Sequence, residues 1–255
     1  MSDALLEVGG LQMRFGGLLA VDGIDFEVRR DEVFAIIGPN GAGKTTVFNC
    51  VGGFYKPSAG RIVMAGEAIA GLPSHRVARM GLVRTFQNIR LFKQLTVVEN
   101  LLVAQHLQVK SGLIHGLLAT PAYRRAEREA LARAVTWLEY MDLKHVANRE
   151  AGTLSYGHQR RLEIARCMIT NPRLLMLDEP AAGLNPQEKI ELQQLIDRLR
   201  RQFNIAVLLI EHDMKLVMGV SDRILVMEHG RPIVTGTPQQ VRSDPRVIKA
   251  YLGED

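Results

Sequence analysis

The stretch that decides the fold class is "VFAIIGPNGAGKTTVFNC", residues 33–50. Val33 to Ile37 are continuously apolar, which is typical of a strand buried on both faces of a sheet. Gly38 to Thr45 fit the pattern G-x-x-x-x-G-K-[ST], and a helix is expected to begin near Lys44. The glycines let successive N–H groups point inward, and the helix N-terminus adds partial positive charge. The stretch therefore predicts an α/β protein whose strand–loop–helix unit binds nucleotide phosphates, with Lys44 on the β- and γ-phosphates and Thr45 on Mg²⁺.

Two later stretches have the same all-apolar character as residues 33–37. They are "RLLMLDEP" at 173–180 and "IAVLLIEHD" at 205–213, and both are predicted to be central strands of a parallel sheet. The first delivers Asp178 and Glu179 to the carboxyl edge, where α/β sheets bind ligands. Asp178 suits Mg²⁺, through water, and Glu179 is placed to orient or deprotonate an attacking water.

The segments before and between these strands have other patterns. Residues 5–15, 19–28 and 61–69 alternate apolar and polar positions, which predicts antiparallel strands with one wet face. Residues 91–151 are rich in Leu, Ala and Arg and predict helices, interrupted by a loop or broken helix at 108–121. One apolar helix face is expected to contain Ala130, Ala134, Trp137, Leu138 and Met141.

The C-terminal third contains clear signals for helix starts and for a turn. Asn185 is predicted to cap a helix, with Pro186 in its first turn and Glu188 completing a capping box. Residues 223–236 predict a hairpin that turns at His229–Gly230. The segment 237–253 then begins a helix with Thr237 as its cap.

Composition limits the class of protein. The 255 residues are 47% hydrophobic and 23% charged, which is ordinary for a globular chain, and the net charge of +5 is only mildly basic. Cys50 and Cys167 form no paired motif, which argues against a disulfide framework or zinc site. The N-terminus lacks a secretory signal, and no apolar run approaches the roughly 20 residues that span a bilayer. We therefore expect a cytosolic chain that reaches a membrane only through a partner.

A second anion site is predicted in "LSYGHQRRLEIARCM", residues 154–168. Ser155 and Gly157 stand just before a long predicted helix, so a hydroxyl, a glycine N–H and a helix N-terminus would meet there. The simpler alternative is that Ser155 only caps the helix. Because the chain already has a phosphate loop, we interpret the second site as one for another molecule's nucleotide.

The ordered set of phosphate loop, "TFQ", "LSYGHQ", "LLMLDEP" and "IEHD" resembles the nucleotide-binding subunit of ATP-binding cassette (ABC) transporters, over nearly the whole chain. The resemblance implies a phosphate-loop NTPase with a RecA-like core, an N-terminal antiparallel β subdomain and an inserted helical subdomain. Within a single domain spanning 1–255, the core would be 1–87 and 158–255, and the helical subdomain 88–157.

What the resemblance implies for the site can be given residue by residue. Phe15 matches the aromatic that stacks on adenine, Gln87 the glutamine that contacts Mg²⁺ and the attacking water, and His212 the histidine that touches the γ-phosphate. The implied catalytic residues are thus Glu179, His212 and Gln87, and the implied Mg²⁺ residues Thr45, Gln87 and Asp178. The implied ATP-binding residues are Phe15, Gly38, Pro39, Asn40, Gly41, Ala42, Gly43, Lys44, Thr45, Thr46, Ser155 and Gly157.

Three positions depart from the commonest family pattern. Tyr156 stands where the first signature glycine usually lies, His158 where a glutamine does, and Asn185 where an aspartate does. ATP hydrolysis is still expected, because the family pattern is retained at Ser155, Gly157, Glu179 and His212. The departures bear on coupling between the two sites and on subunit pairing.

One branch of the family is especially similar: the larger ATPase subunit of the bacterial high-affinity branched-chain amino acid importer. The similarity includes "RFGGLLAVDGIDFEV", "DEPAAGLNPQE" and the extra segment around Gly112 to Tyr123. It implies a second, different ATPase chain, a transmembrane permease and, indirectly, an external substrate-binding protein as partners, at the cytoplasmic face of the cell membrane. The alternatives are the ATPase of a urea/amide importer or lipopolysaccharide exporter. A soluble DNA-acting cassette ATPase fits less well, because such proteins usually carry a long coiled coil or two cassettes in one chain, and 255 residues with no sustained heptads leave room for neither. No nucleic acid is expected as a partner.

Overall fold

The computed structural model describes residues 4–105 and 121–252. The chain folds into two compact units, one formed by residues 1–87 and 173–255 and the other by residues 88–172. Helix α6 (Tyr156–Met168) packs against α3 (Val97–Ala104) and α5 (Pro121–Tyr140) within the second unit, which we call the helical unit. The division expected from the family resemblance, with a helical subdomain at 88–157 inside a single domain, stays a prediction.

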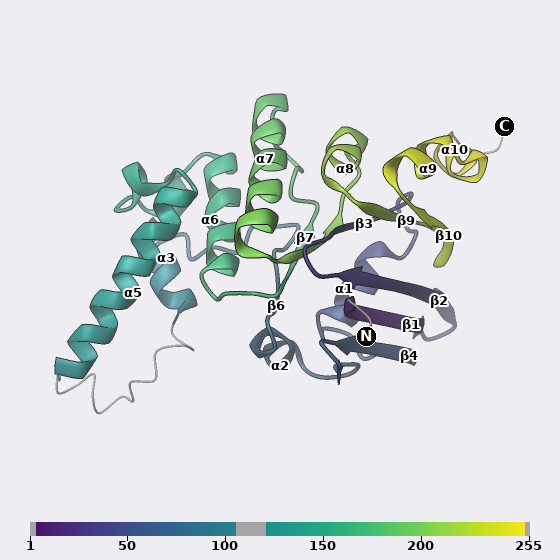
Figure 1. The fold of residues 1–255 in the computed structure, drawn as a ribbon, viewed down its shortest axis with the longest axis horizontal. Helices are drawn as coiled ribbons and strands as arrows, with labels where there is room; N and C mark the ends of the chain where they lie inside the picture. Colours follow the sequence, from purple (N-terminus) through teal and green to yellow (C-terminus); the bar gives the residue numbers. More distant parts are fainter. Residues whose placement is uncertain (1–3, 106–120, 253–255) are drawn as a thin grey trace. The chain divides into compact units, whose positions relative to one another are not determined.

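The discontinuous unit, which we call the core unit, contains a six-stranded sheet of order β10-β9-β3-β8-β7-β6 (Figure 1). Neighbours from β9 to β6 pair in parallel, and only β10 is antiparallel, at one edge. All side chains of β3, β7 and β8 are buried, which confirms the three all-apolar stretches as central strands. The strands are β3 (Val33–Ile37), β6 (Leu82–Arg84), β7 (Leu174–Asp178), β8 (Ala206–Ile210), β9 (Arg223–Glu228) and β10 (Arg231–Gly236).

A second sheet, of order β2-β1-β4-β5, is antiparallel throughout. Its strands alternate buried and exposed positions over much of their length, as the sequence predicted. One continuous hydrophobic core contains residues of both sheets and of helix α1, for example Leu11, Phe48 and Leu208. Phe26 stacks on Phe34, with ring centroids 5.3 Å apart. The strands are β1 (Ala4–Phe15), β2 (Leu18–Arg29), β4 (Ala59–Met64) and β5 (Glu67–Ala68).

The helices of the core unit begin where their sequence signals predict. Asn185 and Glu188 form a capping box at the start of α7, with Pro186 in its first turn, and Thr237 caps α9 in the same way. Beyond α9 the chain forms a further helix, because Asp244 is extended and Pro245 starts α10. The helices are α1 (Lys44–Val51), α2 (Ser74–Arg79), α7 (Pro186–Phe203), α8 (Met214–Val220), α9 (Pro238–Ser243) and α10 (Pro245–Leu252).

The helical unit buries the face predicted for α5. Ala134 and Leu138 are fully buried, and Ala130, Trp137 and Met141 are nearly so. Two short 3₁₀ turns, η1 (Lys144–Val146) and η2 (Ala151–Thr153), connect α5 to α6. The expected interruption at 108–121 and the extra segment around Gly112 to Tyr123 lie almost wholly outside the described residues.

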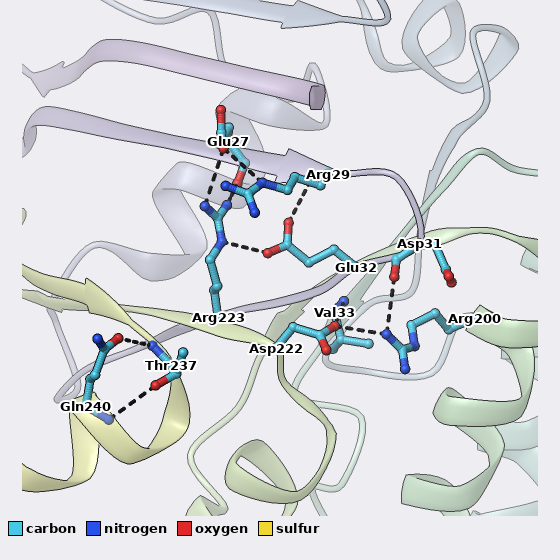
Figure 2. A network of polar contacts seen from close by, with 10 residues as sticks. All are labelled: Glu27, Arg29, Asp31, Glu32, Val33, Arg200, Asp222, Arg223, Thr237 and Gln240. Carbon is cyan, nitrogen blue, oxygen red and sulfur yellow. Dashed lines mark hydrogen bonds and ion pairs between the residues drawn. The ribbon is translucent and has the colours of Figure 1, made fainter. Parts of the chain in front are cut away.

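A polar network ties together the start of β3, the end of β2 and the start of β9 (Figure 2). Glu32 accepts a hydrogen bond from the Arg29 N–H at 2.6 Å and pairs with Arg223 Nε at 2.6 Å. The Arg223 Nη2 also donates to the Glu27 carbonyl at 2.6 Å. Next to it, Asp222 accepts from the Val33 N–H at 2.8 Å. The end of β3 remote from the phosphate loop is therefore fixed by charged side chains.

Within the described ranges 4–105 and 121–252, no helix is both long enough and apolar enough to traverse a bilayer.

Candidate nucleotide site

A cavity of about 400 Å³ lies over the phosphate loop. Residues 40–46 line one part of it, and Leu18, Leu19, Ala20, Glu179, His229 and Gly230 line the rest. Strand β3 ends directly before this loop and α1 begins directly after Gly43, as the sequence predicted. Asn40, Gly41, Ala42, Gly43, Lys44, Thr45 and Thr46 are thus brought together at one cavity.

Two of the loop glycines are required by close packing. Gly38 has φ 151°, and a Cβ atom there would lie 2.0 Å from the Met227 carbonyl oxygen of β9. Gly43 has φ 93°, and its Cβ would lie 2.7 Å from the Ala20 carbonyl oxygen of β2. Real Cβ atoms do not approach backbone this closely, so both positions accept only glycine.

Lys44 is the first residue of α1 and is buried, with 7% of its surface exposed. Its Nζ donates hydrogen bonds to the carbonyl oxygens of Gly38 at 2.7 Å and Pro39 at 2.9 Å. Burial lowers the pKa of Lys44 from its ordinary value, and the negative charges of Glu179 and Asp178 oppose that shift. The lysine therefore brings a positive charge to the same edge of the sheet as the two carboxylates.

Asp178 ends strand β7 and forms a buried ion pair. Its Oδ2 lies 2.6 Å from the Arg84 Nη2, and the two side chains are only 5% and 6% exposed. Arg84 also donates to the Asn49 Oδ1 at 2.7 Å, and its guanidinium carbon lies 5.1 to 5.6 Å from the ring centroids of Phe48, Phe54 and Phe86. The ion pair and the hydrogen bond to Asn49 hold the guanidinium and the Asp178 carboxylate in one orientation.

Glu179 is placed between two other predicted site residues. Its Oε2 accepts a hydrogen bond from the Gln87 Nε2 at 3.2 Å and lies 3.8 Å from the His212 Nδ1. The backbone of Glu179 is left-handed, with φ 47°, which is uncommon for any residue other than glycine. A non-glycine residue held in this conformation is typical of functional sites, where the surrounding structure fixes it.

The loop after β8 carries His212 at the start of α8. Asp213 caps this helix by accepting from the Leu216 N–H at 3.1 Å. Its carboxylate also receives the Lys189 Nζ at 2.7 Å, and this hydrogen bond lowers the pKa of the Asp213 carboxyl. His212 itself is well exposed, with 63% of its side chain accessible.

Phe15 lies at the end of β1 and is partly exposed. Among the described residues, those that line the cavity include Leu18 to Ala20 but not Phe15. Phe15 makes an edge-to-face contact with Tyr55, with ring centroids 5.4 Å apart. An aromatic surface is thus available at the end of β1, as the resemblance implied, with a second ring that the sequence did not indicate.

In the helical unit, Ser155 is the N-cap of α6 and accepts from the His158 N–H at 3.4 Å. Ser155 and Tyr156 are exposed, whereas Gly157 is buried. The Arg160 Nη2 donates a hydrogen bond to the Tyr156 hydroxyl oxygen at 3.3 Å. Ser155 therefore caps α6, and the exposed residues at the start of this helix are accessible to a neighbouring molecule.

Sequence reasoning missed Arg84 and Glu211. Arg84 is one cation in "LVRTFQ", and nothing local connects it to a carboxylate 94 residues away. Glu211 directly follows the apolar strand β8 and is 1% exposed. A usable signal existed for Glu211, because a carboxylate at the end of a buried strand must find several hydrogen-bond donors.

The buried ion pair leads to a stability prediction. Arg84→Met keeps much of the volume but leaves Asp178 buried without its cation, and such a loss costs about 3 to 5 kcal/mol. The matched control is Arg231→Met, which removes a pair with Asp22 at 2.9 Å in which the arginine is 72% exposed. For this exposed pair the loss is under about 1 kcal/mol. Urea unfolding of the two variants checks the difference, and equal losses would contradict a stabilising role for the buried pair.

The fold and the cavity define a phosphate-loop nucleotide-binding protein with an inserted helical unit. Residues 21–182 match the ABC transporter family, and residues 231–255 match a branched-chain amino acid ATP-binding cassette transporter family. The chain is 62% identical, over all of both chains, to the high-affinity branched-chain amino acid transport ATP-binding protein LivG of Salmonella typhimurium. It is also 62% identical, over all of both chains, to the corresponding protein BraF of Pseudomonas aeruginosa.

Solved structures agree with these matches. The crystal structure of the ADP conformation of an ATP-binding cassette of an ABC transporter superposes with a TM-score of 0.86, at 33% identity, over 99% of this chain and 100% of the other. The chain therefore belongs to the ABC transporter family of ATP-binding proteins. The predicted fold class is confirmed, and ATP binding follows from the family.

Proposed function

We propose that this chain is the ATP-hydrolysing subunit of an importer for branched-chain amino acids. The observation that carries the hydrolytic part is the position of Glu179, beside Gln87 and His212 and lining the same cavity as the phosphate loop. The substrate class is supported by the full-length similarity to LivG and BraF and by the family match at residues 231–255.

The residues then have distinct roles. The backbone N–H groups of residues 40–46 and the Lys44 ammonium bind the phosphates of ATP, and Phe15 stacks on the adenine. Gln87 and Glu179 position the attacking water, and Glu179 accepts its proton while the terminal phosphoryl group is transferred to water. His212 contacts the terminal phosphate and stabilises the negative charge that develops on it.

The chemistry of three side chains fits Mg²⁺. Thr45, Gln87 and Asp178 offer hydroxyl, amide and carboxylate oxygens, and the described residues contain no group of three or more His, Cys, Asp or Glu that would suit a softer metal. Mg²⁺ takes few protein oxygens and completes its shell with phosphate and water. When bound with ATP, it would neutralise phosphate charge, with the Asp178 carboxylate held in place by Arg84.

The exposed start of α6 implies a partner. Ser155 and the Gly157 N–H would cover the ATP bound by a second ATPase subunit, which we propose to be a different chain. Binding of ATP closes this pair, and hydrolysis reopens it. The helical unit passes the motion to a transmembrane permease, which places the chain peripherally at the cytoplasmic face of the cell membrane, and an external binding protein delivers the amino acid.

Uptake by vesicles tests the substrate class. Right-side-out membrane vesicles that contain the chain with its co-purifying permease, supplied with the external binding protein, are expected to accumulate labelled leucine, isoleucine or valine when they are loaded with ATP and not when ATP is left out. Labelled urea serves as the competing substrate. Urea uptake without branched-chain amino acid uptake would move the chain to the urea-importer branch, and co-purification with a lipopolysaccharide-exporting permease would move it to the exporter branch.

A further inference from the structure

Glu211 is a buried carboxylate that the roles above do not use. It directly follows strand β8 and directly precedes His212, and none of its side-chain surface is exposed. Glu211 is also absent from the described residues that line the nucleotide cavity. Any effect it has on hydrolysis must therefore pass through other residues.

The Glu211 carboxylate accepts hydrogen bonds from two loops. Its Oε1 accepts from the Ala181 N–H at 2.7 Å. Its Oε2 accepts from the N–H groups of His212 at 2.9 Å and Asp213 at 3.1 Å. One side chain thus joins the loop after Glu179 to the loop that carries His212.

The first of these loops is held at two points. The Glu179 N–H donates to the Ile210 carbonyl oxygen at 2.9 Å, and two residues later Ala181 donates to Glu211. Between these anchors Glu179 adopts its left-handed conformation, with φ 47°. Such a conformation persists only where surrounding contacts fix it, and the second anchor is the Glu211 carboxylate.

The second loop is also fixed on both sides. Glu211 accepts the N–H groups of His212 and Asp213 at the start of this loop. The Asp213 carboxylate pairs with Lys189 of α7 at 2.7 Å. The two loops together place the His212 Nδ1 3.8 Å from the Glu179 Oε2. This distance depends on backbone positions that a single carboxylate holds.

We propose that Glu211 is a positioning residue for ATP hydrolysis, which sets the position of Glu179 relative to His212 by binding both of their loops. The inference rests on the proposed roles of those two residues. Glu211 contacts neither the nucleotide nor the water. It keeps the Glu179 carboxylate and the His212 ring at a fixed distance from one another. A displacement of a catalytic group by about 1 Å can lower the rate a hundredfold.

The test is Glu211→Gln, which keeps the size of the side chain but changes one acceptor oxygen into an NH₂ donor. In either orientation of the amide, this donor faces the N–H of Ala181 or those of His212 and Asp213. We expect kcat to fall at least about tenfold with the KM for ATP almost unchanged, because the phosphate loop is untouched. Combined with Glu179→Gln, the change should lower the rate no further.

Glu32→Gln is the matched control. Glu32 is also a buried carboxylate that accepts a backbone N–H, but it lies at the other end of β3, in the network of Figure 2. Glu32→Gln should lower the melting temperature without lowering kcat of the folded fraction. An unchanged kcat in Glu211→Gln, or an equal loss of kcat in both variants at equal folded fraction, would overturn the positioning role.

Amide hydrogen exchange gives a readout that needs no hydrolysis. In Glu211→Gln, the amides of Glu179, Ala181, His212 and Asp213 should lose protection together, while residues 44–51 of α1 keep theirs. Unchanged protection in either loop would overturn the inference. If the two loops of Glu211→Gln lose protection together but the wild-type protein does not hydrolyse ATP, the proposed function is wrong. The link between the two loops through Glu211 would still hold.

Discussion

Replacement of Glu179 by glutamine is expected to leave ATP binding intact and to lower ATP turnover by at least about a hundredfold. The amide has the size of the carboxylate but cannot accept the proton of the attacking water. Because Glu179 lines the cavity next to residues 40–46 without forming part of the phosphate loop, the loop should bind ATP as before. Equilibrium binding of a fluorescent ATP analogue and steady-state phosphate release measure the two quantities separately.

With its partner present, the same variant should accumulate as a closed pair of subunits in ATP, because reopening depends on hydrolysis. Size-exclusion chromatography with light scattering detects that species. Glu67→Gln serves as the control, since Glu67 is an exposed carboxylate on β5 in the other sheet of the core unit. Wild-type turnover in Glu179→Gln would show that Glu179 is not the general base.

Replacement of Lys44 by methionine should have the opposite signature, with ATP binding itself lost. Methionine fills similar space, but it removes the cation that donates to the Gly38 and Pro39 carbonyls. Among the described residues that line the cavity, no other is a lysine or an arginine. A hydrogen bond between charged groups contributes about 1.5 to 3 kcal/mol. Two such bonds to phosphate oxygens correspond to at least about a hundredfold in affinity.

Isothermal titration with ATP measures that loss. Lys56→Met is the matched control, because Lys56 is an exposed lysine of the core unit and lies outside the cavity lining. Wild-type affinity in Lys44→Met would contradict the assignment of the phosphate site. Loss of binding in Lys44→Met combined with retained binding in Glu179→Gln would separate the residue that binds phosphate from the residue that activates water.

The parts of the structure that follow from local rules could be predicted from the sequence. A five-residue apolar run directly before a glycine loop predicts a buried strand, and residues 33–37 form one. Asn185 and Thr237 cap their helices through hydrogen bonds to residues three positions later. The clustering of Glu179, Gln87 and His212 followed from the family resemblance, and it is visible in the structure as distances of 3.2 and 3.8 Å.

The parts that depend on contacts distant in sequence could not be predicted. Arg84 pairs with Asp178 across 94 residues, and Glu211 reaches Ala181 across 30. The packing of α6 against α3 and α5 is also tertiary, and no local sequence signal indicates it. The break at Pro245 had a local signal in the proline itself.

The position of β3 in its sheet has a consequence for how the protein is made. Its two neighbours are β8 and β9, whose residues come some 170 to 190 positions later, so the first 87 residues cannot complete the sheet around the phosphate loop on their own. The same holds for Glu32, whose partner Arg223 is 191 residues away. The helical unit is continuous in sequence, at 88–172, so it can fold during synthesis before the six-stranded sheet does. The backbone groups of Val33 to Ile37 stay unpaired in the sheet until β8 and β9 have left the ribosome. The nascent chain is thus most vulnerable to misfolding between the emergence of its phosphate loop and the emergence of residue 226.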